Sequence, residues 1–333
     1  MSRGEPGDWR PSASRARLAA RAALLARARQ FFAAHAVLEV DTPLIVNSPV
    51  SDVHIHSATV WLNAPGAAGG DASRTPYFVH TSPEYAMKRL LAAGSGDIYQ
   101  ICHVARGFES GRVHNSEFTL IEWYRLGFSL DALMGEVAAL VRELLGEPAV
   151  RRRVERLSYR ELFLRELNLD PYAADLEALA HAAAGAGFSS AGEHGRDAYL
   201  EVLMGTHIGP RLGRDALTFV YGHPASQAAL ARLDPQDPRA AQRFELYVDG
   251  LELANGFHEL TSCQEQRLRF ERDNAERRRL GLPVHALDER LLAALAHGLP
   301  DCAGVALGFD RTLMLATGAT HIDEVLAFPT SRA

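Results

Sequence analysis

Cysteine is scarce in this chain of 333 residues, with only Cys102, Cys263 and Cys302, and the three lie far apart. That spacing excludes a disulfide framework and a cysteine zinc site, because both need cysteines in paired or closely spaced positions. We therefore expect a protein of a reducing compartment, the cytoplasm.

The sequence also lacks a long apolar run and an excess of positive charge. No stretch reaches the roughly 18 apolar residues that span a bilayer, so no membrane partner is expected. The formal net charge of −6 argues against general binding to a phosphate backbone. The Arg/Ala-rich segment 14–29 has the composition of a transit peptide, but its apolar residues recur at helical spacing, which favours a structural helix.

The hydrophobic share of 47% can supply the core of one large domain or two modest ones. The pattern predicts a helix from Ser12 or Ser14 to His35 and an edge strand at 37–46 that contains Pro43. Strands are predicted at 53–62, 98–106, 117–126, 217–221 and 244–253, helices at 82–91, 130–145 and 264–280, a surface hairpin connection at 63–76, and a strand followed by a helix at 304–317. The expected fold is α+β, an antiparallel sheet with flanking helices.

The segment at about 150–215 is helix-rich and carries no motif chemistry. We interpret it as an insertion within a single catalytic domain that covers 1–333. Ser82 and Pro83 are expected to cap and start the helix at 82–91. The helix at 264–280 is highly charged and is expected to be solvated.

The predicted strand 117–126 carries polar groups on a face that a half-buried strand would turn inward. Alternation places Phe118, Leu120, Glu122 and Tyr124 on one side. Phe118 and Glu122 lie roughly 13 Å apart at about 3.3 Å per residue, a span that fits an adenine at one end and an amino-acid side chain at the other. An exposed strand face is the alternative.

The segment 244–259 contains Asp249-Gly250, the dipeptide most typical of a type I′ hairpin turn. Such a turn pairs Tyr247 with Glu252 and places Glu245 diagonally on the same face, about 7–8 Å away between backbones. Two like charges so placed destabilise a sheet unless a cation joins them, and Mg²⁺ carrying ATP phosphates is suitable. A solvated acidic hairpin is the alternative.

The last predicted helix begins near Asp310 and Arg311. Asp310 is expected to cap that helix, and Arg311 could stack on an aromatic base or bind phosphate. A surface arginine is the alternative.

Together these segments resemble the three signature motifs of class II aminoacyl-tRNA synthetases, in order and over nearly the whole chain. The first helix with 38–43 (LEVDTP) resembles motif 1, which forms the dimer interface in that family. Arg106 with 114–124 (HNSEFTLIEWY) resembles motif 2 of the lysyl subclass. The segment 252–259 (ELANGFHE) is similar to the lysyl segment that precedes motif 3, and 304–311 (GVALGFDR) resembles motif 3 itself.

The resemblance implies a role for each matching residue. It implies that ATP is bound by Arg106, Gly107, Phe108, Glu109, His114, Asn115, Phe118, Glu252, Leu253, Gly308 and Arg311. It implies that the amino acid is bound by Ser82, Pro83, Glu84, Glu122, Tyr124, Asn255, Phe257, Glu259 and Ala306. Arg106 and Arg311 would be catalytic, and Glu245 and Glu252 would hold Mg²⁺.

Within these sets, Phe118 and Arg311 would sandwich the adenine, and Glu84 would receive the amino group near the substrate carboxylate. Glu122, Tyr124 and Glu259 would surround a distal ammonium. Two departures from the family pattern stand in motif 2. Phe108 replaces a carboxylate that meets the adenine amino group, a contact that Glu109 or the backbone would have to supply, and Ser116 replaces a proline.

A lysyl-tRNA synthetase has an OB-fold anticodon domain of about 100 residues or more before motif 1. Here motif 1 begins within the first few dozen residues, so no anticodon recognition is expected. In this form, with 224–227 (PASQ) and with Ala306 where lysyl-tRNA synthetases have glycine, the chain resembles the family of elongation factor P lysine ligases.

That resemblance implies ATP-dependent adenylation of (R)-β-lysine or lysine, and transfer to a lysine ε-amino group of elongation factor P by a homodimer. Two alternatives remain. One is a stand-alone synthetase-like ligase that acts on another acceptor, and the other is a catalytically dead regulator that only binds an amino acid.

Overall fold

The structure is a computed structural model that describes residues 9–63, 74–188 and 195–333. The predicted connection at 63–76 therefore lies mostly outside the described residues. The chain divides into two compact units: unit 1 is Met1–Leu126, Thr261–Asp301 and Gly308–Ala333, and unit 2 is Gly127–Leu260 and Cys302–Leu307. Whether 1–333 acts as one catalytic domain stays a prediction. Within the described ranges, no helix combines the length and the apolar character that crossing a membrane would need.

Unit 1 begins with α1 (Arg15–Ala34), and the predicted Ser14 cap is confirmed, since its Oγ accepts a hydrogen bond from the amide of Arg17 at 3.3 Å. The predicted edge strand at 37–46 is wrong as one element. It divides into β1 (Leu38–Glu39) and β2 (Ile45–Val46), which join different sheets. Pro43 lies between them and has no amide hydrogen to donate to a ladder.

Two groups of paired strands organise unit 1, a separate three-stranded sheet and three strands of the large sheet. In one, β4 (Arg74–Val79) lies between β2 and β3 (Thr59–Asn63), all antiparallel, so only the end of the predicted strand 53–62 forms. In the other, β5 (Ile98–Ala105) pairs with β6 (Glu117–Leu126) antiparallel and with β1 parallel. The remaining helices are α2 (Glu84–Ala92), α8 (Cys263–Arg279), α9 (Glu289–Gly298), α10 (Phe309–Thr317) and the short η5 (Ile322–Glu324).

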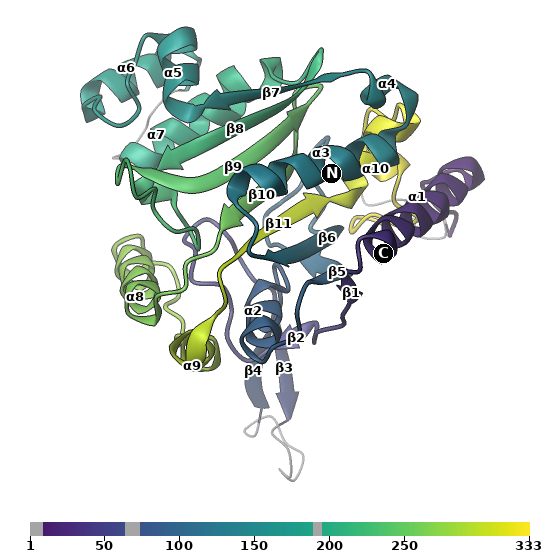
Figure 1. Cartoon of the computed structure of the whole chain (residues 1–333), viewed down its shortest axis with the longest axis horizontal. Helices are drawn as coiled ribbons and strands as arrows, with labels where there is room; N and C mark the ends of the chain where they lie inside the picture. Colours follow the sequence, from purple (N-terminus) through teal and green to yellow (C-terminus); the bar gives the residue numbers. More distant parts are fainter. Residues whose placement is uncertain (1–8, 64–73, 189–194) are drawn as a thin grey trace. The chain divides into compact units, whose positions relative to one another are not determined.

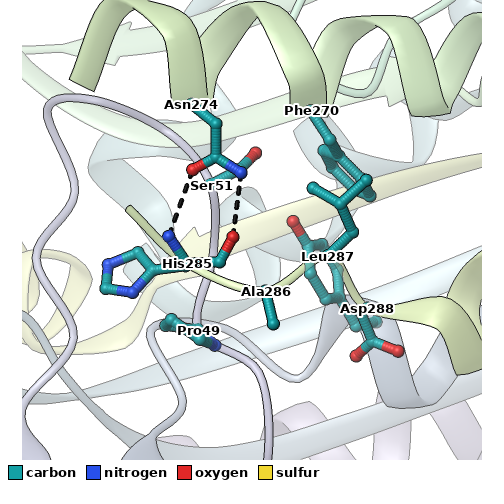
Figure 2. A pocket seen from close by; sticks show the side chains of 9 residues that line it. Pro49, Ser51, Phe270, Asn274, His285, Ala286, Leu287 and Asp288 are labelled. Atoms are coloured by element: carbon teal, nitrogen blue, oxygen red, sulfur yellow. Dashed lines mark hydrogen bonds between the residues drawn. The ribbon is translucent and has the colours of Figure 1, made fainter. Parts of the chain in front are cut away.

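The prediction that the charged helix α8 is solvated is wrong for one of its faces. Arg277 is only 2% exposed, and its guanidinium donates hydrogen bonds to the carbonyls of Pro283 and Asp52. The side chain of Asn274 forms two hydrogen bonds with the backbone of His285, as Figure 2 shows. These contacts border a small pocket between α8, α2 and the loop at Pro49, and no predicted site residue lines it.

Unit 2 holds a sheet in the strand order β11-β10-β9-β8-β7 (Figure 1). Its strands are β7 (Arg153–Ser158), β8 (Ala216–Pro224), β9 (Ala240–Val248), β10 (Leu251–His258) and β11 (Cys302–Gly308). Helix α3 (Leu130–Leu145) packs on β9 and β10. The sheet is antiparallel except for β7, which runs parallel to β8. The expectation of an antiparallel sheet therefore fails at the edge pairs β1–β5 and β7–β8.

The segment predicted as an insertion contributes most of an apolar cluster that also includes Val220 of β8 and Tyr247 of β9. Its helices are α4 (Glu147–Val150), α5 (Tyr159–Leu167), α6 (Leu176–Gly185), α7 (Arg196–Val202), η2 (Leu203–Ile208) and η3 (Gly209–Arg211). Ser158 starts α5 with a capping box to Glu161, a local signal that the sequence carries. Phe163, Leu179 and Leu200 are fully buried in the cluster. The apolar faces of these helices therefore serve packing rather than catalysis.

Candidate active site

The carboxylate of Glu122 is the centre of a buried hydrogen-bonded group in unit 1. Ser82 donates from Oγ to Oε2 at 2.7 Å, and the phenol of Tyr124 donates to Oε1 at 2.7 Å. Glu122 is 2% exposed. Burial, followed by the charge of Glu84, raises the pKa of Glu122 to about 7, against the pull of the two hydrogen bonds. The predicted pocket face of β6 therefore carries a carboxyl group that can change charge near neutral pH.

Lys88 lies beside this group and was not predicted. Its ammonium is 2.6 Å from Oε1 of Glu84, one turn earlier in α2, and its side chain is 1% exposed. The predicted start of this helix is wrong by one residue, because α2 begins at Glu84 and its N-cap is Pro83 rather than Ser82. The Oγ of Ser82 still accepts a hydrogen bond from the Glu84 amide at 3.0 Å. When both carboxyl groups are ionised, Glu84, Glu122 and Lys88 together carry one net negative charge. An ammonium group of a ligand would balance that charge.

The motif 2 arginine lies over an aromatic ring. The guanidinium carbon of Arg106 is 5.1 Å from the ring centroid of Phe118, and Nε donates to the carbonyl of Thr81 at 3.2 Å. Glu109 pairs with Arg106 at 3.7 Å. The side chain of Phe108 is 90% exposed, and its ring meets His56 edge to face with the ring centroids 5.1 Å apart.

Gly107 in the same turn is held by a hydrogen bond from its amide to the carbonyl of His56 at 2.7 Å. Phe108 itself has φ +64°, an uncommon conformation for a bulky residue. The turn after β5 is therefore fixed by its backbone rather than by the side chain of Phe108.

The motif 3 arginine is held by motif 2 within unit 1. Arg311 donates to Nε2 of His114 at 2.5 Å and to the carbonyl of Val113 at 3.3 Å. Burial and the charge of Arg311 lower the pKa of His114, so the imidazole is neutral at pH 7 and accepts this bond. The amide of Asn115 bonds to backbone instead, donating to the carbonyl of Glu117 at 2.6 Å and accepting from the amide of Thr330 at 3.1 Å.

The prediction that Asp310 caps α10 is wrong. The N-cap is Gly308, and Asp310 is buried one residue into the helix. Its carboxylate accepts from the backbone amide of Thr119 at 2.6 Å and from Arg21. Asp310 thus ties the start of the motif 3 helix to β6 and to α1.

In unit 2, the hairpin register predicted from Asp249-Gly250 is confirmed, since both residues have positive φ and Tyr247 pairs with Glu252. A β-bulge at Leu253, which the sequence argument missed, then shifts the register, so that Ala254 pairs with Leu246.

Because side chains alternate along a strand, one extra residue moves every later side chain to the other face. The bulge therefore places Glu252 and Asn255 on the same face, although they are three residues apart. Asn255 now lies opposite Glu245 and beside Ala306 of β11. Leu253 and Ala254 are both buried, as expected where a bulge changes the phase, but this burial cannot be read from the sequence.

Glu245 is surrounded by polar partners. Its Oε1 is 2.6 Å from Nη2 of Arg243 and 3.4 Å from Nε2 of His223, and its Oε2 accepts from the phenol of Tyr247 at 2.7 Å. Burial opposes ionisation of Glu245, but His223 and Arg243 outweigh it and hold the pKa of the carboxyl well below its usual range. Neither Arg243 nor His223 was among the site residues predicted from the sequence.

The other predicted residues of unit 2 lie along the same two strands. Phe257 follows Asn255 on the β10 face, and the guanidinium carbon of Arg243 is 5.9 Å from its ring centroid. Glu259 comes directly after β10, is 1% exposed, and donates its backbone amide to the carbonyl of Cys302 at 3.0 Å. Gly256 packs so closely on β9 that an added Cβ would overlap the ring of Phe244.

The chain belongs to the class II tRNA synthetase family, because the family described as "tRNA synthetases class II (D, K and N)" matches residues 7–332. Curated relatives match it nearly from end to end. A protein of Yersinia enterocolitica named elongation factor P (R)-beta-lysine ligase is 49% identical over 331 residues, 99% of each chain.

Two further relatives carry the same name. The protein of Proteus mirabilis is 48% identical over 331 residues, 99% of each chain. The protein of Vibrio cholerae is 48% identical over 328 residues, 98% of this chain and 99% of the relative. These matches confirm the expected class II synthetase fold and the expected class of enzyme, an ATP-using ligase.

Proposed function

We propose that this protein adenylates a lysine-like amino acid, (R)-β-lysine or lysine, with ATP and transfers it to a lysine ε-amino group of elongation factor P. The observation that carries the proposal is the buried group around Glu122, in which Ser82, Tyr124, Glu84 and Lys88 surround a carboxyl group with a pKa of about 7. Such a group favours a ligand that brings its own ammonium. Elongation factor P is proposed as the acceptor because the relatives are named as its ligases.

The reaction needs no protein nucleophile. A substrate carboxylate oxygen attacks the α-phosphorus of ATP, the bond from that phosphorus to the bridging oxygen breaks, and pyrophosphate leaves. The acceptor ε-amino nitrogen then attacks the acyl carbon, an amide forms, and AMP leaves with the loss of one proton. Arg106 and Arg311 would stabilise the negative charge that develops on the phosphoryl oxygens.

The proposal includes Mg²⁺, for which the β9–β10 hairpin offers the carboxylates of Glu245 and Glu252. Glu245 is ionised, and its Oε2 keeps a lone-pair site beyond the hydrogen bond that it accepts from Tyr247. Glu252 lies on the same face beside Tyr247. Within the described ranges, no cluster of three or more His, Cys, Asp or Glu could hold a metal ion, so ATP phosphates and water would have to complete the coordination. Bound Mg²⁺ would neutralise phosphate charge.

The homodimer and the cytoplasmic location also belong to this proposal. Leu38, in the segment that resembles motif 1, is 57% exposed, and Leu44, directly after that segment, is 47% exposed. The homodimer rests on the resemblance to motif 1, and the exposed leucines are compatible with an interface between two copies.

The test is mass spectrometry of elongation factor P after incubation with the enzyme, ATP and (R)-β-lysine. We expect a covalent gain of one lysyl unit on one acceptor lysine, and none when ATP is omitted. An acceptor that stays unmodified while the enzyme actively adenylates the amino acid would refute the proposed acceptor. Running tRNA and free amines alongside shows whether another acceptor takes its place.

A further inference from the structure

Arg243 occupies the middle of β9 and spreads its guanidinium over three different segments of unit 2. Nη2 contacts Glu245 at 2.6 Å, Nε donates to Oδ1 of Asn255 at 3.1 Å, and Nη1 donates to the carbonyl of Gln227 at 2.7 Å. Gln227 is the last residue of η4 (Ala225–Gln227). All three nitrogens of one side chain are therefore engaged, each in a different direction.

The contacts link two residues with different implied tasks. By the resemblance to class II synthetases, Glu245 would stand on the ATP side of the site, as a carboxylate for Mg²⁺, and Asn255 would stand on the amino-acid side. The bulge at Leu253 makes the link possible, because it sets Asn255 directly opposite Glu245. Arg243 itself is 17% exposed, so its hydrogen bonds form where water competes poorly.

The chemistry of the site requires an arginine at this position. A guanidinium is a planar fork with five donors, whereas a lysine ammonium is a point charge that cannot span three acceptors in fixed directions. The ring of Phe257, with its centroid 5.9 Å from the guanidinium carbon, limits the plane in which the fork can lie. If Arg243 only balanced the charge of Glu245, its contact with that carboxylate would be sufficient, and the contacts with Asn255 and Gln227 would not be needed.

Building on the function proposed above, we propose that Arg243 is a positioning residue that joins the ATP half of the site to the amino-acid half. It fixes the carboxylate of Glu245 and the amide of Asn255 in one arrangement, so that each ligand meets a group already oriented for it. Loss of the fork releases both groups at once.

The experiment measures amino-acid-dependent pyrophosphate exchange for Arg243→Lys and Arg243→Gln, with KM determined separately for ATP and for (R)-β-lysine. We expect both KM values to rise at least about tenfold in each variant, because each loses a charge-assisted hydrogen bond on either side of the site. Glu245→Gln should raise chiefly the KM for ATP, and Asn255→Ala chiefly the KM for the amino acid. Arg239→Lys, an exposed arginine paired with Asp237, is the matched control and should change neither value.

A double-mutant cycle separates positioning from general damage. Arg243→Gln combined with Asn255→Ala should raise the amino-acid KM no further than the larger single effect, because the two residues act through one contact. Thermal unfolding of every variant checks that it is folded, and Arg243→Lys keeps the test usable if Arg243→Gln does not fold.

Wild-type enzyme without exchange activity would overturn the proposed function. If the wild-type enzyme is active, an Arg243→Lys variant that changes only one KM or only kcat would overturn the role of Arg243. An Arg243→Gln variant that combines additively with Asn255→Ala would overturn it as well.

Discussion

Glu122 carries a prediction that follows from its environment, namely that amino-acid binding depends on pH around neutrality. The carboxyl group is buried and near Glu84, and its pKa is raised to about 7. A cationic substrate would bind the ionised form, so the enzyme must lose the Glu122 proton before or during binding. Raising the pH through 7 should therefore tighten binding, and lowering it should weaken binding.

The expected size follows from the fraction of Glu122 that is ionised. With a pKa of about 7, about a tenth of the enzyme carries the charge at pH 6 and about nine tenths at pH 8, so the amino-acid KM should be about tenfold higher at pH 6. The same shift affects stability. Because the folded state binds this proton more tightly than the unfolded state does, stability falls as pH rises from 4.5 to 7. The full penalty, on the order of 3 kcal/mol, is present above pH 7.

The assay is pyrophosphate exchange at saturating ATP, with the amino-acid KM determined from pH 6 to 8. Glu122→Gln is the matched control, because it keeps the shape of the side chain and removes the group that titrates. This variant should bind the amino acid poorly at every pH, with a flat profile, and should gain stability over the wild type at pH 8 but not at pH 4.5. A wild-type KM that does not change across this range, or an equal pH dependence in Glu122→Gln, would refute the reasoning.

Three further variants test single contacts. Lys88→Met should move the midpoint of the pH profile upward, because Lys88 favours the ionised form of Glu122, and Lys88→Arg should restore most of the original profile. Asp310→Asn should lower the free energy of unfolding by about 2 kcal/mol, measured in denaturant, because it weakens charge-assisted bonds to β6 and α1. Gly213→Ala should cost at least about 2 kcal/mol more than Gly94→Ala, since both glycines have positive φ but only at Gly213 would a Cβ overlap the backbone of β9.

Local signals made several elements predictable. The strand Glu117–Leu126 and the helix Leu130–Leu145 have the predicted bounds, because alternation and helical spacing are properties of the segment itself. The hairpin register followed from Asp249-Gly250, since the turn type fixes which residues face each other.

The features that sequence reasoning missed depend on contacts between segments. The bulge at Leu253 depends on how β10 meets its neighbours, and no local rule for a hairpin includes it. Lys88 and Arg277 were not expected inside, because these residue types are mostly exposed unless a partner is available. For Lys88 the partner was visible four residues earlier, at Glu84, whereas the carbonyl partners of Arg277 could not be read from the sequence.

The central claim is that this site adenylates a lysine-like amino acid, and ATP–pyrophosphate exchange with (R)-β-lysine and with lysine as separate substrates tests it most directly. We predict exchange that depends on one or both isomers and is lost in Glu122→Gln at substrate concentrations near the wild-type KM. Exchange absent with both isomers, in folded protein supplied with ATP and Mg²⁺, would contradict the claim and favour a protein that binds an amino acid without activating it.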